Sequence, residues 1–215
     1  MIICFDVDNT LVRAEPIHID AFKLAFKKHN LKVPSSRKIR NYFGLVGTVL
    51  VKKLFPNLDN KKILEVVKDH DSYVINKTAK NAIVIMGVRR ALKKLKSKGY
   101  RLALVSNSKH KEINAILRFA KFEKNLFDVI IGNEEVVHPK PNPDMILKAM
   151  KKLKEKGGYM VGDTIYDIQA GKKAKLKTIA VLTGQQNKAT LKKANPDYII
   201  KSVRKINKIL KSPIL

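Results

Sequence analysis

Short apolar runs alternate with helix-length segments through most of the chain, and this alternation limits the fold more than any other feature of the sequence. Beyond Met86, apolar runs typical of buried strands lie at residues 101–105, 127–131, 159–161, 178–182 and 198–200. The spacing between and after these runs predicts helices at 87–98, 109–120, 142–156, 165–174, 189–194 and 203–210. Repeated strand–helix units are typical of the α/β class, in which helices cover both faces of a mostly parallel sheet.

The first predicted strand, residues 2–5, is separated from this series by a stretch of a different kind. That stretch carries helical patterns at 18–29, 46–55 and 61–75, and its expected breaks are at Pro34, Pro56, Asn57 and Asn76. A wholly helical block after the first strand is best explained as an insertion. We therefore predict an α/β core domain from residues 1–13 and 84–215 and an inserted helical domain at 14–83; a chain of 215 residues can bury the core this needs.

The chain is strongly basic, with 45 Lys and Arg residues, 18 Asp and Glu residues and a net charge of +27. Such a charge ordinarily suggests a nucleic-acid partner. However, 37 of the basic residues are Lys and are spread over nearly every predicted helix, whereas surfaces that read nucleic-acid sequence favour the planar fork of Arg. We expect a solvated surface that attracts small anions, and no specific nucleic-acid partner.

The sequence carries no sign of export or of membrane insertion. It has no run of 18 or more apolar residues, and residues 1–5 lead directly into Asp6 without a basic segment or a cleavage site. We therefore expect a protein without membrane contact that stays in the cytoplasm. The single cysteine, Cys4, lies in the first apolar run and is predicted to be a core residue.

Four polar clusters follow predicted strands at or soon after their carboxyl ends. They are Asp6-Val7-Asp8-Asn9-Thr10, Ser106-Asn107-Ser108, Lys140-Pro141-Asn142-Pro143 and Gly162-Asp163-Thr164-Ile165-Tyr166-Asp167. In open α/β sheets this edge is where ligands bind. The first cluster holds two neighbouring carboxylates, and the last holds two with the i, i+4 spacing of one helix face. Carboxylates so close together need a cation, and Mg²⁺ suits their hard oxygen ligands.

Positive charge and hydrogen-bond donors accompany these carboxylates. Lys140 lies among prolines that stiffen the backbone, and it can offset the negative charge. Ser106 and the backbone amides after it lead into a predicted helix and can bind phosphate oxygens. The clusters together offer a nucleophile, an acid or base, a metal site and an oxyanion clamp, which together indicate phosphoryl transfer.

The four clusters resemble the four motifs of the haloacid dehalogenase superfamily. Any one of them alone is a weak signal, but all four in order on successive strands are a strong one. The resemblance implies a Rossmann-like parallel sheet with the first-motif strand at its centre. It also implies that Asp6 is the nucleophile, which becomes an aspartyl phosphate, and that Asp8 is the general acid and base.

The same resemblance implies how the metal ion and the phosphate are bound. The implied Mg²⁺ ligands are Asp6, Asp8 through its backbone carbonyl, Asp163 and Asp167. The implied phosphate-binding residues are Ser106, Asn107 and Lys140, with Thr10 supporting the turn. Asn9 replaces the usual glycine of the first motif, and Asn tolerates unusual backbone angles better than most residues. Dehalogenase members lack the second carboxylate, so Asp8 favours phosphate chemistry.

The predicted insertion resembles the type-1 helical cap of phosphoglycolate phosphatases and β-phosphoglucomutase-like members, and residues 11–18 resemble the entry into that cap. A lid of this kind excludes bulk water and admits small substrates. Candidate substrate contacts are Glu15, His18 and Arg40. Arg40 is included because Gly44 and Gly47 follow it in a segment that resembles the subgroup's substrate-contacting turn.

Three functions stay open from the sequence. The leading hypothesis is a Mg²⁺-dependent phosphatase for a small phosphorylated metabolite, either phosphoglycolate-like or a sugar phosphate, that acts as a monomer or homodimer. A phosphomutase shares all four motifs but returns the phosphoryl group to a substrate hydroxyl. The third hypothesis is a non-enzymatic basic protein that binds nucleic acid. The intact acidic clusters oppose it, because their mutual repulsion is costly without a metal.

Overall fold

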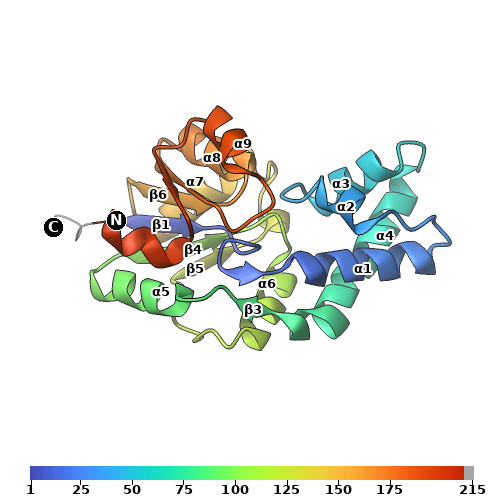
Figure 1. The fold of residues 1–215 in the computed structure, drawn as a ribbon, viewed down its shortest axis with the longest axis horizontal. Helices are drawn as coiled ribbons and strands as arrows, with labels where there is room; N and C mark the ends of the chain where they lie inside the picture. The colour runs from blue at the N-terminus through green and yellow to red at the C-terminus, as the bar shows by residue number, and fades with distance from the viewer. Residues whose placement is uncertain (211–215) are drawn as a thin grey trace.

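A parallel six-stranded sheet forms the centre of the computed structural model, in which residues 1–210 are described (Figure 1). Its strands are β1 (Ile2–Phe5), β4 (Arg101–Val105), β5 (Val129–Ile131), β6 (Gly158–Gly162), β7 (Lys177–Val181) and β8 (Tyr198–Ile200). They are hydrogen-bonded in the order β5-β4-β1-β6-β7-β8, and every neighbouring pair is parallel. This confirms the α/β, Rossmann-like fold and places the first strand between β4 and β6.

Helices cover both faces of the sheet. They are α5 (Val88–Ser97), α6 (His110–Phe119), α7 (Asp144–Leu153), α8 (Ile165–Lys173) and α9 (Lys188–Lys193). Figure 1 shows α7, α8 and α9 on one side of the strands and α5 on the other. Because both faces are covered, the strands are mostly apolar instead of alternating with polar residues, and the exposed Arg101 and Lys177 stand only at the first positions of β4 and β7.

Successive residues of β1 pack into opposite layers of the core. Ile3 and Phe5 belong to the apolar cluster that includes α5 and α6, whereas Ile2 and Cys4 belong to the cluster beneath α7 and α8. Cys4 is fully buried, and burial raises the pKa of its thiol to about 12. The prediction that Cys4 is a core residue is therefore confirmed.

A group of helices lies beside the sheet, on the right of Figure 1, and we call it the helical insertion. It comprises α1 (Glu15–Lys28), α2 (Ser36–Arg40), α3 (Gly47–Leu54), α4 (Asn60–Tyr73), the π-helix η1 (Val74–Thr78) and the 3₁₀ helix η2 (Ala79–Asn81). The insertion buries an apolar cluster of its own, which includes Phe22, Phe26 and Val66. Ile17 and Val74 instead join the main core, so the insertion is also packed against the sheet domain.

Two short strands mark where the chain leaves and re-enters the sheet domain. β2 (Val12–Arg13) and β3 (Ile83–Val84) form an antiparallel pair. The prediction of a wholly helical stretch is therefore wrong at its end, because Ile83 belongs to strand β3 of this antiparallel pair. The predicted break at Asn76 is also wrong. Asn76 Nδ2 donates to the backbone oxygen of Ser72 at 2.9 Å, and the backbone continues as a π-helical turn.

Two further helix predictions need correction. The helix predicted at 142–156 is the shorter α7, because Pro143 stands at its N-cap and Lys154 takes a left-handed conformation with φ +56° that ends it. The C-terminal helix is a 3₁₀ helix, η4 (Val203–Lys208). Its buried residues Val203 and Ile206 are three positions apart, which matches the repeat of a 3₁₀ helix. Among residues 1–210, no helix combines the length and apolar character needed to cross a membrane.

Candidate active site

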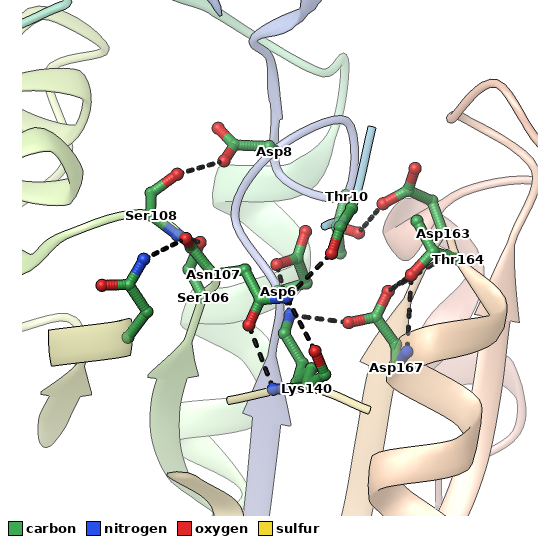
Figure 2. A network of polar contacts seen from close by, with 12 residues as sticks. Asp6, Asp8, Thr10, Ser106, Asn107, Ser108, Lys140, Asp163, Thr164 and Asp167 are labelled. Carbon is green, nitrogen blue, oxygen red and sulfur yellow. Dashed lines mark hydrogen bonds and ion pairs between the residues drawn. The ribbon is translucent and has the colours of Figure 1, made fainter. Parts of the chain in front are cut away.

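The carboxyl ends of β4, β1 and β6 are neighbours, and each carries one of the polar clusters predicted from the sequence. Ser106 follows β4, Asp6 follows β1 and Asp163 follows β6. Lys140 reaches the same place from the loop before α7 and is buried. Figure 2 shows these side chains gathered with Asp167 around the end of β1. The structure thus brings residues from distant parts of the chain together, while their chemical roles stay predictions.

Lys140 supplies the positive charge at the centre of this group. Its Nζ atom lies 2.6 Å from Asp6 Oδ1 and 2.6 Å from Asp167 Oδ1 (Figure 2). Burial would lower the pKa of Lys140, but the carboxylates of Asp167 and Asp6 outweigh it and raise that pKa above its ordinary value. Lys140 is therefore a fixed cation at neutral pH.

Asp167 contacts both Lys140 and the first turn of α8. One carboxylate oxygen binds Lys140, while Oδ2 accepts hydrogen bonds from the Thr164 backbone N at 3.0 Å and from Thr164 Oγ1 at 2.6 Å. Thr164 is the N-cap residue of α8, so these bonds fix the first turn of the helix. The helix cap and the charged site therefore share one carboxylate, whose position is set by the fold.

Asp163 is held by Thr10 and fits against a glycine. Thr10 Oγ1 donates to Asp163 Oδ1 at 2.9 Å, and a Cβ atom placed on Gly184 would stand 1.8 Å from Asp163 Oδ2. Likewise, a Cβ on Gly162 would stand 2.2 Å from Asp167 Cγ. Sequence analysis missed Gly184, because nothing in its local sequence shows that it faces a carboxylate from another loop.

The three carboxylates of Asp6, Asp163 and Asp167 exceed the Lys140 ammonium by two negative charges. One oxygen from each carboxylate lies within 4.8 Å of the others. Burial raises the pKa of Asp6 to about 7 against the lowering effect of Lys140. Burial, together with the charges of Asp6 and Asp167, raises the pKa of Asp163 well above its ordinary value. The donor atoms of this group are all oxygens, and the group carries two more negative than positive charges. Both properties fit a hard divalent cation such as Mg²⁺.

Asp8 is directed away from this group. Figure 2 shows its carboxylate turned toward Ser108, whose Oγ donates to Asp8 Oδ2 at 3.0 Å, and His18 Nε2 lies 3.3 Å from Asp8 Oδ1. Burial would raise the pKa of Asp8, but the charge and hydrogen bond of His18, with the hydrogen bond of Ser108, hold it below its ordinary value. Asn9 takes the left-handed conformation with φ +57°, which confirms that an unusual backbone angle is required there.

The two predicted phosphate ligands after β4 differ in their surroundings. Ser106 is buried, and its Oγ accepts a hydrogen bond from the Ser108 backbone N at 3.1 Å. The Asn107 side-chain amide makes hydrogen bonds to two other segments of the chain. Its Nδ2 donates to the backbone oxygens of Gly44 at 2.8 Å and Lys140 at 2.9 Å. Its Oδ1 accepts a hydrogen bond from the Lys140 backbone N at 3.1 Å. Asn107 therefore positions the Lys140 loop and contacts the helical insertion.

The three candidate substrate contacts lie on a cavity of about 630 Å³ between the helical insertion and the sheet edge. Arg40 Nε donates to Glu15 Oε1 at 2.5 Å, and Gln185 from the loop after β7 donates to the other Glu15 oxygen. His18 is buried and lies between Asp8 and His70. Sequence analysis missed His70, because its only sequence signal is the helical spacing that places it on the buried face of α4.

The fold and the site together define an α/β protein with an acidic, lysine-centred site at the switch point of a parallel sheet. Residues 3–181 match the family model of haloacid dehalogenase-like hydrolases, and the chain belongs to this family of enzymes.

Relatives of full length agree with this membership. The chain is 29% identical over 208 residues to pyrophosphatase PpaX of Oceanobacillus iheyensis, covering 95% of this chain and 94% of that protein. It is 26% identical over 212 residues to pyrophosphatase PpaX of Bacillus cereus, covering 97% and 95%. A solved structure of a haloacid dehalogenase-like hydrolase from Streptococcus pneumoniae has a TM-score of 0.85 at 23% identity, covering 97% of each chain. The last likeness concerns the fold alone.

Proposed function

We propose that this protein is a Mg²⁺-dependent phosphatase that hydrolyses a small phosphorylated metabolite. The observation that carries this proposal is the buried group of Asp6, Asp163 and Asp167 around Lys140 at the ligand-binding edge of the sheet. Its excess of two negative charges fits a divalent cation, which would neutralise the group and leave Lys140 and the cation as the positive charges nearest to a bound phosphate. Membership of a hydrolase family, and relatives named as pyrophosphatases, support phosphate chemistry.

The first half of the proposed reaction transfers the phosphoryl group to Asp6. The Asp6 carboxylate attacks phosphorus and the bond to the leaving oxygen breaks, which yields an aspartyl phosphate. Asp8 gives a proton to the leaving oxygen, while Lys140 and Ser106 hold the phosphate oxygens. Mg²⁺ bound by Asp6, Asp163 and Asp167 would supply positive charge that keeps these buried carboxylates ionised and offsets the phosphate.

The second half hydrolyses the aspartyl phosphate. Asp8, now a carboxylate, takes a proton from a water molecule, and the water oxygen attacks phosphorus and releases Asp6. Hydrogen bonding by Ser108 and His18 lowers the pKa of Asp8, and this favours the ionised form that the step requires. Asp8 is therefore mostly ionised at neutral pH, which suits its role as a base, and it must take up a proton before it acts as the acid of the first half.

The proposed substrate is small and anionic. The helical insertion would act as a cap over the cavity, and a cavity of about 630 Å³ suits a metabolite better than a phosphoprotein. Arg37 and Arg40 line the side of the cavity that belongs to the insertion and can meet a second anionic group. Because relatives are named pyrophosphatases, pyrophosphate is the first substrate to test, and phosphoglycolate is the second.

The test is phosphate release from a panel of pyrophosphate, phosphoglycolate and sugar phosphates, with Mg²⁺ and with a chelator. We expect release that requires Mg²⁺ and disappears in Asp6→Asn, whereas Asp20→Asn, which changes an exposed aspartate of α1, retains the wild-type rate. Metal-independent release, or activity that survives Asp6→Asn, would contradict the proposal. Isomerised sugar phosphate without free phosphate would instead show a phosphomutase.

A further inference from the structure

A second buried cluster of ionisable side chains lies between the helical insertion and the sheet domain. It consists of His18 from α1, His70 from α4 and Glu112 from α6, all buried. One donor atom from each residue lies within 4.8 Å of the others. From this geometry we infer a binding site for a transition-metal cation such as Zn²⁺, separate from the proposed Mg²⁺ site.

The donor types differ from those at the Mg²⁺ site. Two imidazoles and one carboxylate are ligands that Zn²⁺ accepts, whereas Mg²⁺ prefers oxygen atoms alone. His18 Nδ1 and His70 Nε2 face each other at 3.2 Å. Two nitrogen ligands of one tetrahedral ion lie about 3.3 Å apart when each metal–nitrogen bond is about 2.0 Å. The separation of these two nitrogen atoms is therefore close to that of two ligands of one tetrahedral ion.

The other nitrogen of each imidazole faces a carboxylate. His70 Nδ1 lies 2.9 Å from Asp71 Oδ1, and His18 Nε2 lies 3.3 Å from Asp8 Oδ1. Such outer carboxylates fix the tautomer of metal-binding histidines. His18 carries the charge that acts on Asp8, so its Nδ1–H can donate to the lone pair of His70 Nε2 without a metal. A divalent cation bound here would take the place of that one proton between the two nitrogens.

Glu112 has an oxygen that the fold leaves unpaired. Its Oε2 accepts a hydrogen bond from the Lys109 backbone N at 2.8 Å, whereas the buried Oε1 accepts none within residues 1–210 and lies 3.7 Å from His70 Nδ1. The Lys109 ammonium is engaged elsewhere, 2.7 Å from Asp71 Oδ2. A buried carboxylate oxygen without a donor is costly, so this atom is available as a ligand.

The formal charges of the cluster point the same way. The carboxylates of Asp8, Asp71 and Glu112 surround the imidazoles, and Lys109 is the ammonium that pairs with this group in the described part of the chain. Three carboxylates against Lys109 and a charged His18 leave one negative charge, and a divalent cation that displaces the His18 proton would balance the group. His18, His70 and Glu112 also line the cavity, so an ion can reach them from solvent.

Occupancy of this site would join two parts of the molecule. His18 and His70 belong to the helical insertion, while Glu112 belongs to the sheet domain. A bound ion would therefore fix the insertion against the sheet domain directly beside Asp8. Because only the folded chain brings these ligands together, the ion should also raise the thermal unfolding midpoint.

The test is titration of the chelator-treated full chain with Co²⁺, whose visible absorption distinguishes four-coordinate from six-coordinate sites. The Asp163→Asn background removes a ligand of the proposed Mg²⁺ site. In that background we expect one tightly bound, four-coordinate Co²⁺ per chain that Zn²⁺ displaces. Glu112→Gln, which is nearly isosteric, should weaken binding at least about tenfold, and His70→Gln should weaken it at least as much. His138→Gln changes an exposed histidine outside the cluster and should bind as the background does.

The inference is overturned if the background protein shows no four-coordinate absorption, or if Glu112→Gln binds Co²⁺ as tightly as His138→Gln. It is also overturned if Zn²⁺ raises the thermal unfolding midpoint of Glu112→Gln by as much as that of His138→Gln. A cluster balanced by protons alone would give these results. Circular dichroism of each variant shows whether a loss of binding is caused by a loss of fold. If His70→Gln does not fold, the comparison of Glu112→Gln with His138→Gln still tests the inference.

Discussion

Gly184→Ala should disable the proposed Mg²⁺ site without changing any charged residue. Gly184 follows β7, and a Cβ atom there would stand 1.8 Å from Asp163 Oδ2 and 2.5 Å from Asp163 Cγ. No left-handed φ is required of Gly184, so alanine can adopt its backbone conformation. The substitution therefore acts through one contact, in which the new methyl group displaces the Asp163 carboxylate.

The size of the effect follows from that contact. Side-chain Cβ atoms essentially never come closer than 3.0 Å to such an atom, so the carboxylate oxygen and the methyl group must separate by at least 1.2 Å more. Misplacement of a catalytic group by about 1 Å costs about a hundredfold in rate. This corresponds to about 2.7 kcal/mol in activation free energy. Thr10, which donates to the other oxygen of Asp163, limits how far the carboxylate can adjust.

The assay is hydrolysis of p-nitrophenyl phosphate over a range of Mg²⁺ concentrations. We expect Gly184→Ala to lower kcat about a hundredfold and to raise the Mg²⁺ concentration that gives half the maximal rate. Gly157→Ala is the matched control, because a Cβ on Gly157 meets nothing within 4 Å. The reasoning is refuted if Gly184→Ala retains the wild-type rate and Mg²⁺ dependence, or if Gly157→Ala loses as much activity.

Three further substitutions test the electrostatics of the structure. Lys140→Met leaves two carboxylates buried without their cation, so we expect the free energy of unfolding without Mg²⁺ to fall by about 3 kcal/mol in urea denaturation. Asp163→Asn removes one of the excess charges, so the calorimetric unfolding midpoint without metal should rise while phosphatase activity is lost; an unchanged midpoint would contradict the charge count. Burial would raise the pKa of Asp197, but hydrogen bonds from Thr178 outweigh it and lower that pKa. Asp197 therefore stabilises the fold above its unfolded pKa near 3.8 and loses this effect as the pH falls through its lowered folded pKa. In urea series, Asp197→Asn should thus be less stable than wild type at neutral pH and equal to it in strong acid.

The sheet and most of its helices could be predicted because their signals are local. An apolar run between helical segments indicates a buried strand wherever it occurs, and parallel strands place their carboxyl ends at one edge. Asp6, Ser106 and Asp163 each follow such a run directly, so their meeting at that edge needed no knowledge of side-chain contacts. The C-terminal 3₁₀ helix and the π-helical turn at Asn76 were missed, because helical spacing alone does not separate these forms from an α-helix.

The tertiary structure decided what surrounds these residues. The hydrogen bond from Ser108 to Asp8, the fit of Asp163 against Gly184 and the cluster of His18, His70 and Glu112 all join segments that are distant in sequence. No local pattern encodes such contacts, because they depend on how the helical insertion packs against the sheet and on which loop ends beside which carboxylate. Hydrophobic patterning thus determined where the acidic site forms, whereas packing determined which neighbours set its charge and geometry.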